Sequence, residues 1–350
     1  MLAVRRVGPN REMVIDRRRF LRASAAGIAA TAGGVLLPSL PARAAGASRV
    51  AFYRHSGLPN QDEATRAATV KALVGSAVQV ATGQGTPERA WRSLFSADDM
   101  VAIKVNCMAG MLSPSLDVVN AIVEGLKGAG VDPDKITIYD KEDRDLEAAG
   151  YTLNDKPPGP LVQGTVGGPN APGYCARFTT RGDTTFRLSN IVAERTTAIV
   201  NVPVVKDHIF AGMTGALKNH FGTIHNPEDF HYITGCSPAV ADVNCAADLR
   251  AKQRLIVGDA LRVQYEGGPS YQANAVYEYW GVFAGTDPVA VDSQLLVLLD
   301  TLRRQHGLKP LSETDRPVRY LEPAAEKELG TLDPNQIELI YADLAERPGG

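Results

Sequence analysis

The sequence lacks the cysteine patterns that hold metal clusters. Its four cysteines are widely spaced and form no C-x-x-C pair, which excludes a ferredoxin-type iron–sulfur cluster and a zinc site made of cysteine alone. No iron–sulfur cofactor is therefore expected. Cys236 and Cys245 are near enough in sequence to form a disulfide in an oxidising compartment. Their spacing does not show whether the two Cα atoms come within bridging distance.

Several functional signatures are also absent. The sequence contains no G-x-G-x-x-G, G-x-x-x-x-G-K-[ST] or G-x-S-x-G motif. A dinucleotide-binding domain, a P-loop nucleotide site and an α/β-hydrolase therefore lack their main indicators. Beyond the N-terminal segment, no run approaches the ~18 uninterrupted apolar residues of a membrane-spanning helix.

The N-terminal segment is typical of a twin-arginine export signal. The charged residues 16–22, with paired arginines before Phe-Leu, run into the weakly apolar Ala/Gly stretch 23–40. An A-x-A pattern at 42–44 predicts cleavage near Ala45 or Gly46. A retained anchor and an untargeted tail are the alternatives. The prediction is a periplasmic or secreted protein that uses the twin-arginine translocase and touches the membrane only through an uncleaved signal.

The export signal changes the charge of the mature protein. Residues 1–44 hold eight arginines against Glu12 and Asp16, whereas the whole chain has a formal net charge of −2. Cleavage would leave the mature chain near −8. Nucleic acid and anionic membranes require a basic surface. We therefore expect no nucleic-acid partner.

Apolar, β-branched runs alternate with helical patterns along the chain. The predicted strands are 49–54, 100–107, 136–140, 198–205, 255–263, 280–284 and 337–341, and the predicted helices are 63–80, 115–129, 188–194, 238–252 and 288–304. This alternation predicts an α/β fold with a mostly parallel, helix-flanked sheet of the doubly wound type. We expect a signal peptide over 1–45 and one α/β domain over 46–350, with a Pro/Gly-rich excursion at about 155–183.

Polar residues follow the predicted strands, where ligands of such sheets bind. They include Asn106, Asp140, Lys206, His208 and Asp259. Cys107 stands at the end of its strand as a metal ligand, a nucleophile or a packed thiol. Asp287 precedes Pro288 and predicts a helix N-cap.

Four of the six histidines lie within residues 201–231. They are candidate ligands for a transition metal: His208, His220, His225 and His231. Their separations of twelve, five and six residues match no known metal template. Hydrogen-bonding or substrate-contacting roles are the alternative, and the metal stays one candidate cofactor.

The same stretch predicts an anion site. Residues 212–215, with Thr214 and Gly215, lead into a predicted short helix over 216–221, whose N-terminal amides would attract a negative group. Three lysines add positive charge there: Lys104, Lys206 and Lys218. The alternative is that Lys104 and Lys218 extend their ammonium groups to solvent or form ion pairs with Asp140, Asp259 or Asp287.

At VAIKVNC, NVPVVKDH and TGALKNHFG, the sequence resembles the bacterial and archaeal family called domain of unknown function 362, from about Val50 to the C-terminus. The matching residues include Lys104 and Asn106, Asp140, Pro203, Lys206 and His208, Gly215, Lys218, Asn219 and Gly222, Asp259, Asp287 with Pro288, and Asp292. The resemblance supports the fold and the position of the site, but it implies no reaction. Some members carry ferredoxin-type modules, and this chain lacks their cysteine run.

The leading hypothesis is an exported enzyme of unknown reaction, with redox chemistry as one option, whose cleft binds a metal or a small anion. Its predicted catalytic residues are Lys104, Lys206, His208 and Lys218, and its predicted ligand contacts are Asn106, Asp140, Thr214, Gly215, Asn219 and Asp259. The first alternative is a periplasmic binding protein that captures an anion or a metal without turnover. The second is a partner or assembly factor of a periplasmic complex, docking through 155–183.

Overall fold

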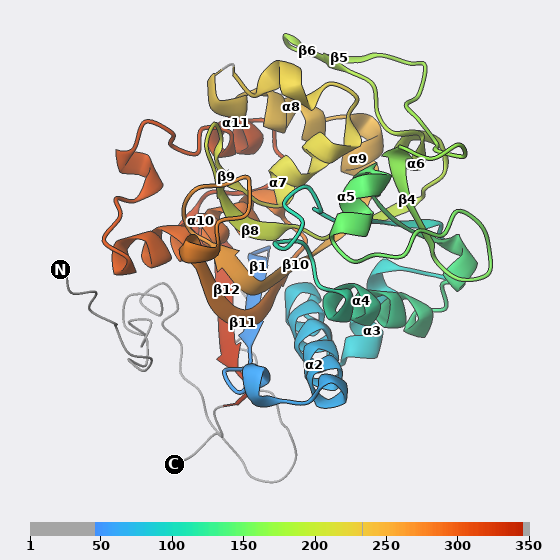
Figure 1. Cartoon of the computed structure of the whole chain (residues 1–350), viewed down its shortest axis with the longest axis horizontal. Coiled ribbons are helices and arrows are strands. Elements are labelled where there is room, and N and C mark those ends of the chain that lie inside the picture. Colours follow the sequence, from blue (N-terminus) through green and yellow to red (C-terminus); the bar gives the residue numbers. More distant parts are fainter. Residues whose placement is uncertain (1–45, 233, 346–350) are drawn as a thin grey trace, which may run out of the picture. The chain divides into compact units, whose positions relative to one another are not determined.

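A mixed sheet forms the centre of the protein in the computed structural model, which describes residues 46–232 and 234–345. The predicted export signal lies outside the described residues. Within them, a 10-stranded sheet runs in the order β12-β1-β11-β10-β7-β2-β3-β4, with β8 paired to β10 and β9 paired to β8 (Figure 1). Its strands are β1 Ser48–Arg54, β2 Val101–Lys104, β3 Ile136–Glu142, β4 Leu161–Val166, β7 Ala198–Asn201, β8 Val204–His208, β9 Gly212–Thr214, β10 Gln253–Gln264, β11 Val276–Gly285 and β12 Ile337–Asp343.

Most strand pairs of this sheet are parallel. The parallel pairs are β1–β12, β2–β3, β2–β7, β3–β4, β7–β10 and β8–β10. The pairs β1–β11, β10–β11 and β8–β9 are antiparallel. A short connection joins β10 directly to β11, and only an antiparallel partner can be reached in this way. The predicted α/β class with a mostly parallel sheet is confirmed.

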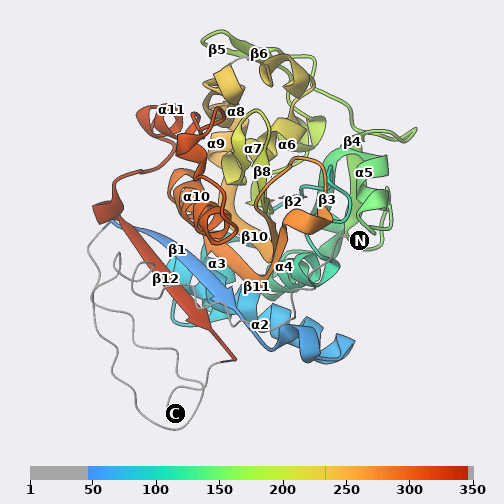
Figure 2. The same cartoon turned by 60° about the vertical axis from the view of Figure 1, so that its left-hand side comes forward.

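Helices cover both sides of the sheet (Figures 1 and 2). The first group, α2, α3 and α4, packs together, and α2 lies against β1 and β11. On the other side α10 contacts the same two strands and carries α7 and α11. The helices are α2 Glu63–Thr82, α3 Pro87–Leu94, α4 Leu116–Gly128, α5 Asp143–Ala148, α6 Asn190–Glu194, α7 Ala216–Asn219, α8 Ala239–Asn244, α9 Ala247–Lys252, α10 Pro288–Gln305 and α11 Leu321–Glu326. No helix among the described residues is long and apolar enough to cross a membrane.

Local sequence signals account for the helix starts. Asp62 and Ser115 accept hydrogen bonds from main-chain amides in the first turns of α2 and α4. Asp287 Oδ1 accepts from the amides of Val289 and Ala290, which confirms the N-cap predicted for α10. Each of these caps satisfies amides that have no partner inside the helix.

Two predicted elements are divided in the structure. The predicted strand 198–205 breaks at Val202 and Pro203 into β7 and β8, because proline has no N–H group for the ladder. The predicted helix 238–252 divides into α8 and α9. The break at Pro203 moves β8 alongside the far half of β10, with Lys206 opposite Gln264.

The Pro/Gly-rich segment 155–183 is less irregular than its composition suggests. It contributes β4, the edge strand that pairs with β3, and the first strand of the hairpin β5 Thr179–Arg181 and β6 Thr184–Phe186. The four cysteines, all within the described residues, are free thiols, so Cys236 and Cys245 are not joined.

Candidate functional site

A buried ion pair lies where β2 and β3 end. Lys104 is the last residue of β2, and its Nζ atom is 2.7 Å from Oδ1 of Asp140 on the neighbouring strand. Asp140 also accepts from the amide of Cys107 at 2.6 Å and from the amide of Lys141 at 2.8 Å. Both carboxylate oxygens are therefore occupied by internal donors. The alternative that Lys104 pairs with Asp140 is correct.

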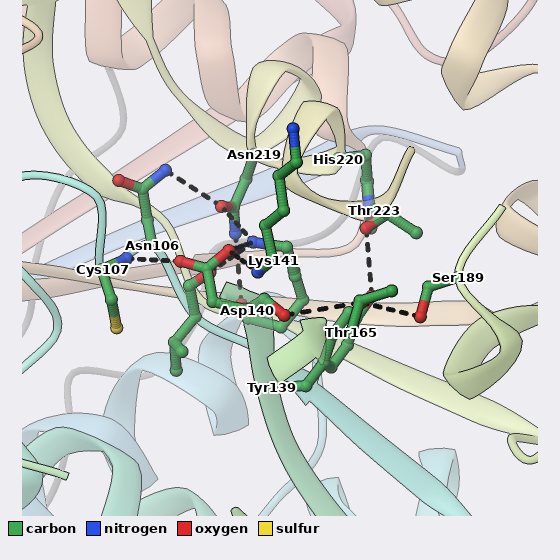
Figure 3. Close-up of polar contacts among 12 residues, drawn as sticks. Asn106, Cys107, Tyr139, Asp140, Lys141, Thr165, Ser189, Asn219, His220 and Thr223 are labelled. Carbon is green, nitrogen blue, oxygen red and sulfur yellow. Dashed lines mark hydrogen bonds and ion pairs between the residues drawn. The ribbon is translucent and has the colours of Figure 1, made fainter. Parts of the chain in front are cut away.

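Two asparagines connect this pair to a second lysine. Asn219 of α7 accepts from Lys104 Nζ at 3.2 Å. It also accepts from Asn106 Nδ2 at 3.1 Å (Figure 3). The other end of Asn106 accepts from Lys206 Nζ at 3.1 Å. Asn219 also donates to the Lys104 carbonyl oxygen. Residues from β2, β8 and α7 are thus held together although they are far apart in sequence.

Lys206 and Lys218 are buried ammonium groups without a carboxylate partner. Lys206 is 0% exposed and Lys218 is 7% exposed. Across the described residues, neither forms an ion pair: Lys206 donates to Asn106, and Lys218 Nζ is 3.1 Å from Nε2 of His231. The pKa of each lysine is lowered to about 8, mainly by burial, and for Lys206 the charge of Lys218 acts in the same direction. Desolvation disfavours the charged form of an amine.

Two histidines border these lysines. The rings of His208 and His231 stack with centroids 5.4 Å apart. His208 Nδ1 accepts from the amides of Phe210 and Ala211, which assigns the proton to Nε2 in the neutral ring. Burial and then the Lys218 charge lower the pKa of both rings, and that of His231 falls to about 4. Both imidazoles are therefore neutral near pH 7.

The four predicted histidine ligands do not assemble into a metal set. His220 is engaged with Gln253 Oε1 at 2.6 Å and with Asn201. His225 Nδ1 accepts from the amide of Arg187, and its ring packs against Tyr174 and Phe178. No group of three or more His, Cys, Asp or Glu side chains in the described part of the chain is placed to hold a metal. The four-histidine prediction is therefore corrected.

The predicted anion site at the start of α7 is already filled by a side chain. The amides of Ala216 and Leu217 donate to Asp292 of α10 at 2.6 and 3.1 Å. A Cβ atom on Gly215 would lie 2.4 Å from Asp292 Oδ1, so only glycine permits this approach. Thr214 is buried in β9. Gly215 therefore positions α7 against Asp292, and this corrects its predicted contact with an external anion, whereas the ligand contact of Thr214 stays a prediction.

Asp259, a predicted ligand contact, lies apart from the three lysines, and Cys107 differs from its nucleophilic alternative. Asp259 accepts from the amides of Ser115 and Leu261 at 2.7 and 2.8 Å, and it lines a cavity of about 280 Å³ that none of the three lysines lines. Burial raises the pKa of the Cys107 thiol, as does the nearby Asp140 charge. Since the thiolate is the reactive form, Cys107 is a packed thiol.

Sequence reasoning missed the supporting roles of Asn201, Asp292 and Gly222. Asn201 ends β7 and accepts from Asn219 Nδ2 at 2.8 Å, so its place at a strand end was an available signal. A Cβ atom on Gly222 would lie 2.8 Å from both Asp140 Oδ1 and Lys104 Nζ. No local pattern indicates that contact.

Comparisons with known proteins give a family but no activity. The family model described as "Domain of unknown function (DUF362)" matches residues 101–296. No curated protein matches the chain. One solved structure, of a structural-genomics target from Thermotoga maritima, is similar over 69% of this chain and 59% of its own, at 11% identity and a TM-score of 0.37. The chain thus spans less than two thirds of that protein.

Proposed function

Since this chain belongs to the domain of unknown function 362 family, whose description assigns no activity, we propose from its own residues that it is an exported enzyme acting on a small anionic substrate. The main support is the presence of two buried ammonium groups, those of Lys206 and Lys218, which have no carboxylate partner among the described residues. Export is supported by the arginine pair, apolar stretch and A-x-A pattern of residues 16–45.

Electrostatics favours an anion at this cluster. A buried charge is costly unless a counter-charge or hydrogen bonds compensate it. Asp140, whose charge acts on Lys206, is already occupied by Lys104 and two amides. An external anion would supply the missing negative charge, and it would raise the pKa of both lysines. A metal is the weaker candidate ligand, because only two of the four histidines, His208 and His231, lie together.

The same groups supply proton-transfer chemistry. A lysine with a pKa of about 8 is partly neutral near that pH, so it can accept a proton as well as donate one. Neutral His231 lies beside Lys218 and can accept a hydrogen bond from it. Asn106 and Asn219 hold the lysines in place through side-chain hydrogen bonds. This arrangement suits acid–base catalysis on a bound anion.

The first test is ligand-dependent thermal stability with phosphate, sulfate, oxalate and succinate. We expect at least one of these anions to raise the Tm of the wild type as its concentration rises, because a ligand that binds only the folded state stabilises it by mass action. Lys206→Met and Lys218→Met should lose this response. Their Tm without ligand should hold or increase, since each removes an unpaired buried charge.

Lys71→Met is the matched control, because Lys71 is exposed on α2. It should respond as the wild type does. Anion affinity should also decline as the pH rises through about 8, where the two lysines lose their charge. An unchanged response in both buried-lysine variants would contradict the site.

Turnover separates the enzyme from the binding-protein alternative. The stabilising anion is incubated with the wild type and with Lys206→Met, and both mixtures are analysed by mass spectrometry. A product formed only by the wild type supports catalysis. Saturable binding without any product supports a binding protein instead.

A further inference from the structure

A cavity of about 280 Å³ lies between the start of α4, residues of α2, and the antiparallel pair β10–β11. None of the lysines and histidines of the proposed anion site lines it. Its lining combines apolar side chains with hydroxyls and charges, including Trp280, Arg66, Arg262, Asp117, Asp259 and Glu278. Most of the lining side chains are polar or charged, and the apolar ones include the large indole of Trp280, so the cavity suits a polar ligand with one apolar face. We name it the Trp280 cavity.

Trp280 has an unusual backbone that orients its ring. Its φ angle is +59°, a left-handed conformation that is rare for a bulky residue. The ladder between β10 and β11 shifts register here, so that β11 has one more residue than β10 between the pairs Ala260–Gly281 and Arg262–Glu278. Such a bulge redirects side chains and is common beside binding sites. The half-buried indole thereby lines the cavity.

The charges of the lining largely compensate one another. Arg66 Nε is 3.1 Å from Asp117 Oδ2, and Arg262 donates to the Met111 carbonyl oxygen. Asp259 is 4% exposed and takes two main-chain amides. With three carboxylates against two guanidinium groups, the cavity has no excess positive charge that would select an anion. It contrasts in this respect with the Lys206 and Lys218 cluster.

We propose that the Trp280 cavity binds one ring of a neutral saccharide. A sugar ring presents an apolar face of C–H groups that suits a flat indole, and its hydroxyls both donate and accept hydrogen bonds. Glu278 supplies acceptors, Arg262 supplies donors, and the hydroxyls of Ser113 and Ser115 line the same space. A neutral, hydroxyl-rich ligand uses these groups without adding an uncompensated charge. The inference does not depend on the proposed function.

Tryptophan fluorescence provides a direct test, because the chain has two tryptophans. Trp91 is 4% exposed between α3 and α4, so only Trp280 should respond to a ligand in the cavity. The full-length protein is titrated with glucose, N-acetylglucosamine, maltose and cellobiose. We expect a saturable change in emission with at least one of them. Inorganic phosphate should cause no such change.

The decisive variant is Trp280→Gly. Glycine adopts positive φ freely, so this variant removes the indole while relieving the backbone conformation, and its Tm should hold or increase. Calorimetric titration should show at least about ten-fold weaker sugar binding. Lys206→Met should bind sugar normally, which separates this site from the anion site. The inference is overturned if no sugar changes the emission or if Trp280→Gly binds with wild-type affinity.

Discussion

The buried carboxylate of Asp292 occupies the main-chain amides at the start of α7, so they are not available to an external anion. Asp292 is 0% exposed and accepts from the amides of Ala216 and Leu217. Burial raises its pKa from 3.8 to about 7, even though the two amide donors act in the opposite direction. The folded protein therefore holds this proton more tightly than the unfolded chain does. Stability from this group is greatest at low pH, and it declines as the pH rises from about 4 to about 7.

Asp292→Asn should flatten this pH dependence, because asparagine does not titrate. Between about pH 5 and about pH 7, the free energy of unfolding of the wild type should decline by about 2 kcal/mol relative to that of the variant. Urea unfolding at both pH values measures the difference. Asp98→Asn, at an exposed position, is the control and should follow the wild type. Parallel pH profiles for the wild type and Asp292→Asn would refute the assigned titration.

At the scale of elements, the contact between α3 and α4 depends on one missing side chain. Gly125 lies within α4, and a Cβ atom there would lie 2.2 Å from the ring of Trp91 on α3. The indole packs directly onto the backbone of α4 as a result. A further glycine of the same helix, Gly128, has nothing within 4 Å of its Cβ position. Substitutions at these two glycines therefore distinguish the effect of packing against Trp91 from the effect of helix propensity.

Gly125→Ala should destabilise the protein by about 1–3 kcal/mol, because the methyl group overpacks the interface between the helices. Gly128→Ala should instead be neutral or stabilise it by up to about 1 kcal/mol, since alanine is the better helix former. Both values come from urea unfolding at one pH. Equal effects of the two substitutions would show that Trp91 does not pack as described.

At the scale of the whole molecule, the net negative charge of residues 45–350 contrasts with the buried cationic cluster. Removing residues 1–44 takes eight arginines and two acids from a chain of net charge −2. The remaining residues carry a formal net charge of −8, while Lys206 and Lys218 are buried. Export in the folded state would preserve this buried cluster, which only the completed fold assembles.

The export proposal predicts a defined precursor and product. Expressed with its full N-terminus in a bacterium that has a twin-arginine translocase, the protein should appear in the periplasm with a new N-terminus near Ala45 or Gly46. Replacing Arg17 and Arg18 by lysine should leave the uncleaved precursor in the cytoplasm. The second arginine pair, Arg5 and Arg6, is the matched control, and its replacement by lysine should not block export. Periplasmic product from the Arg17 and Arg18 variant would exclude this route.

The sequence by itself determined the local elements and the edge of the sheet that carries the polar residues. Apolar runs identified β1, β2, β3 and β10, since burial on both faces requires continuous apolar strands. The Asp287-Pro288 step identified the start of α10 through capping chemistry that acts within a few residues. The segment of β4 escaped prediction because its Pro and Gly content hides an edge strand.

Only the tertiary structure decided which charges are paired. Lys104 and Asp140 are separated by 36 residues and Ala216 and Asp292 by 76 in sequence, so no local pattern reveals either contact. These contacts occupy the carboxylates of Asp140 and Asp292. Lys206 and Lys218 therefore have no carboxylate partner among the described residues. Of the four histidines that are close in sequence, His208 and His231 stack on one another, whereas His220 and His225 lie in other surroundings. Sequence proximity places residues near one another, whereas packing and burial determine what each of them binds.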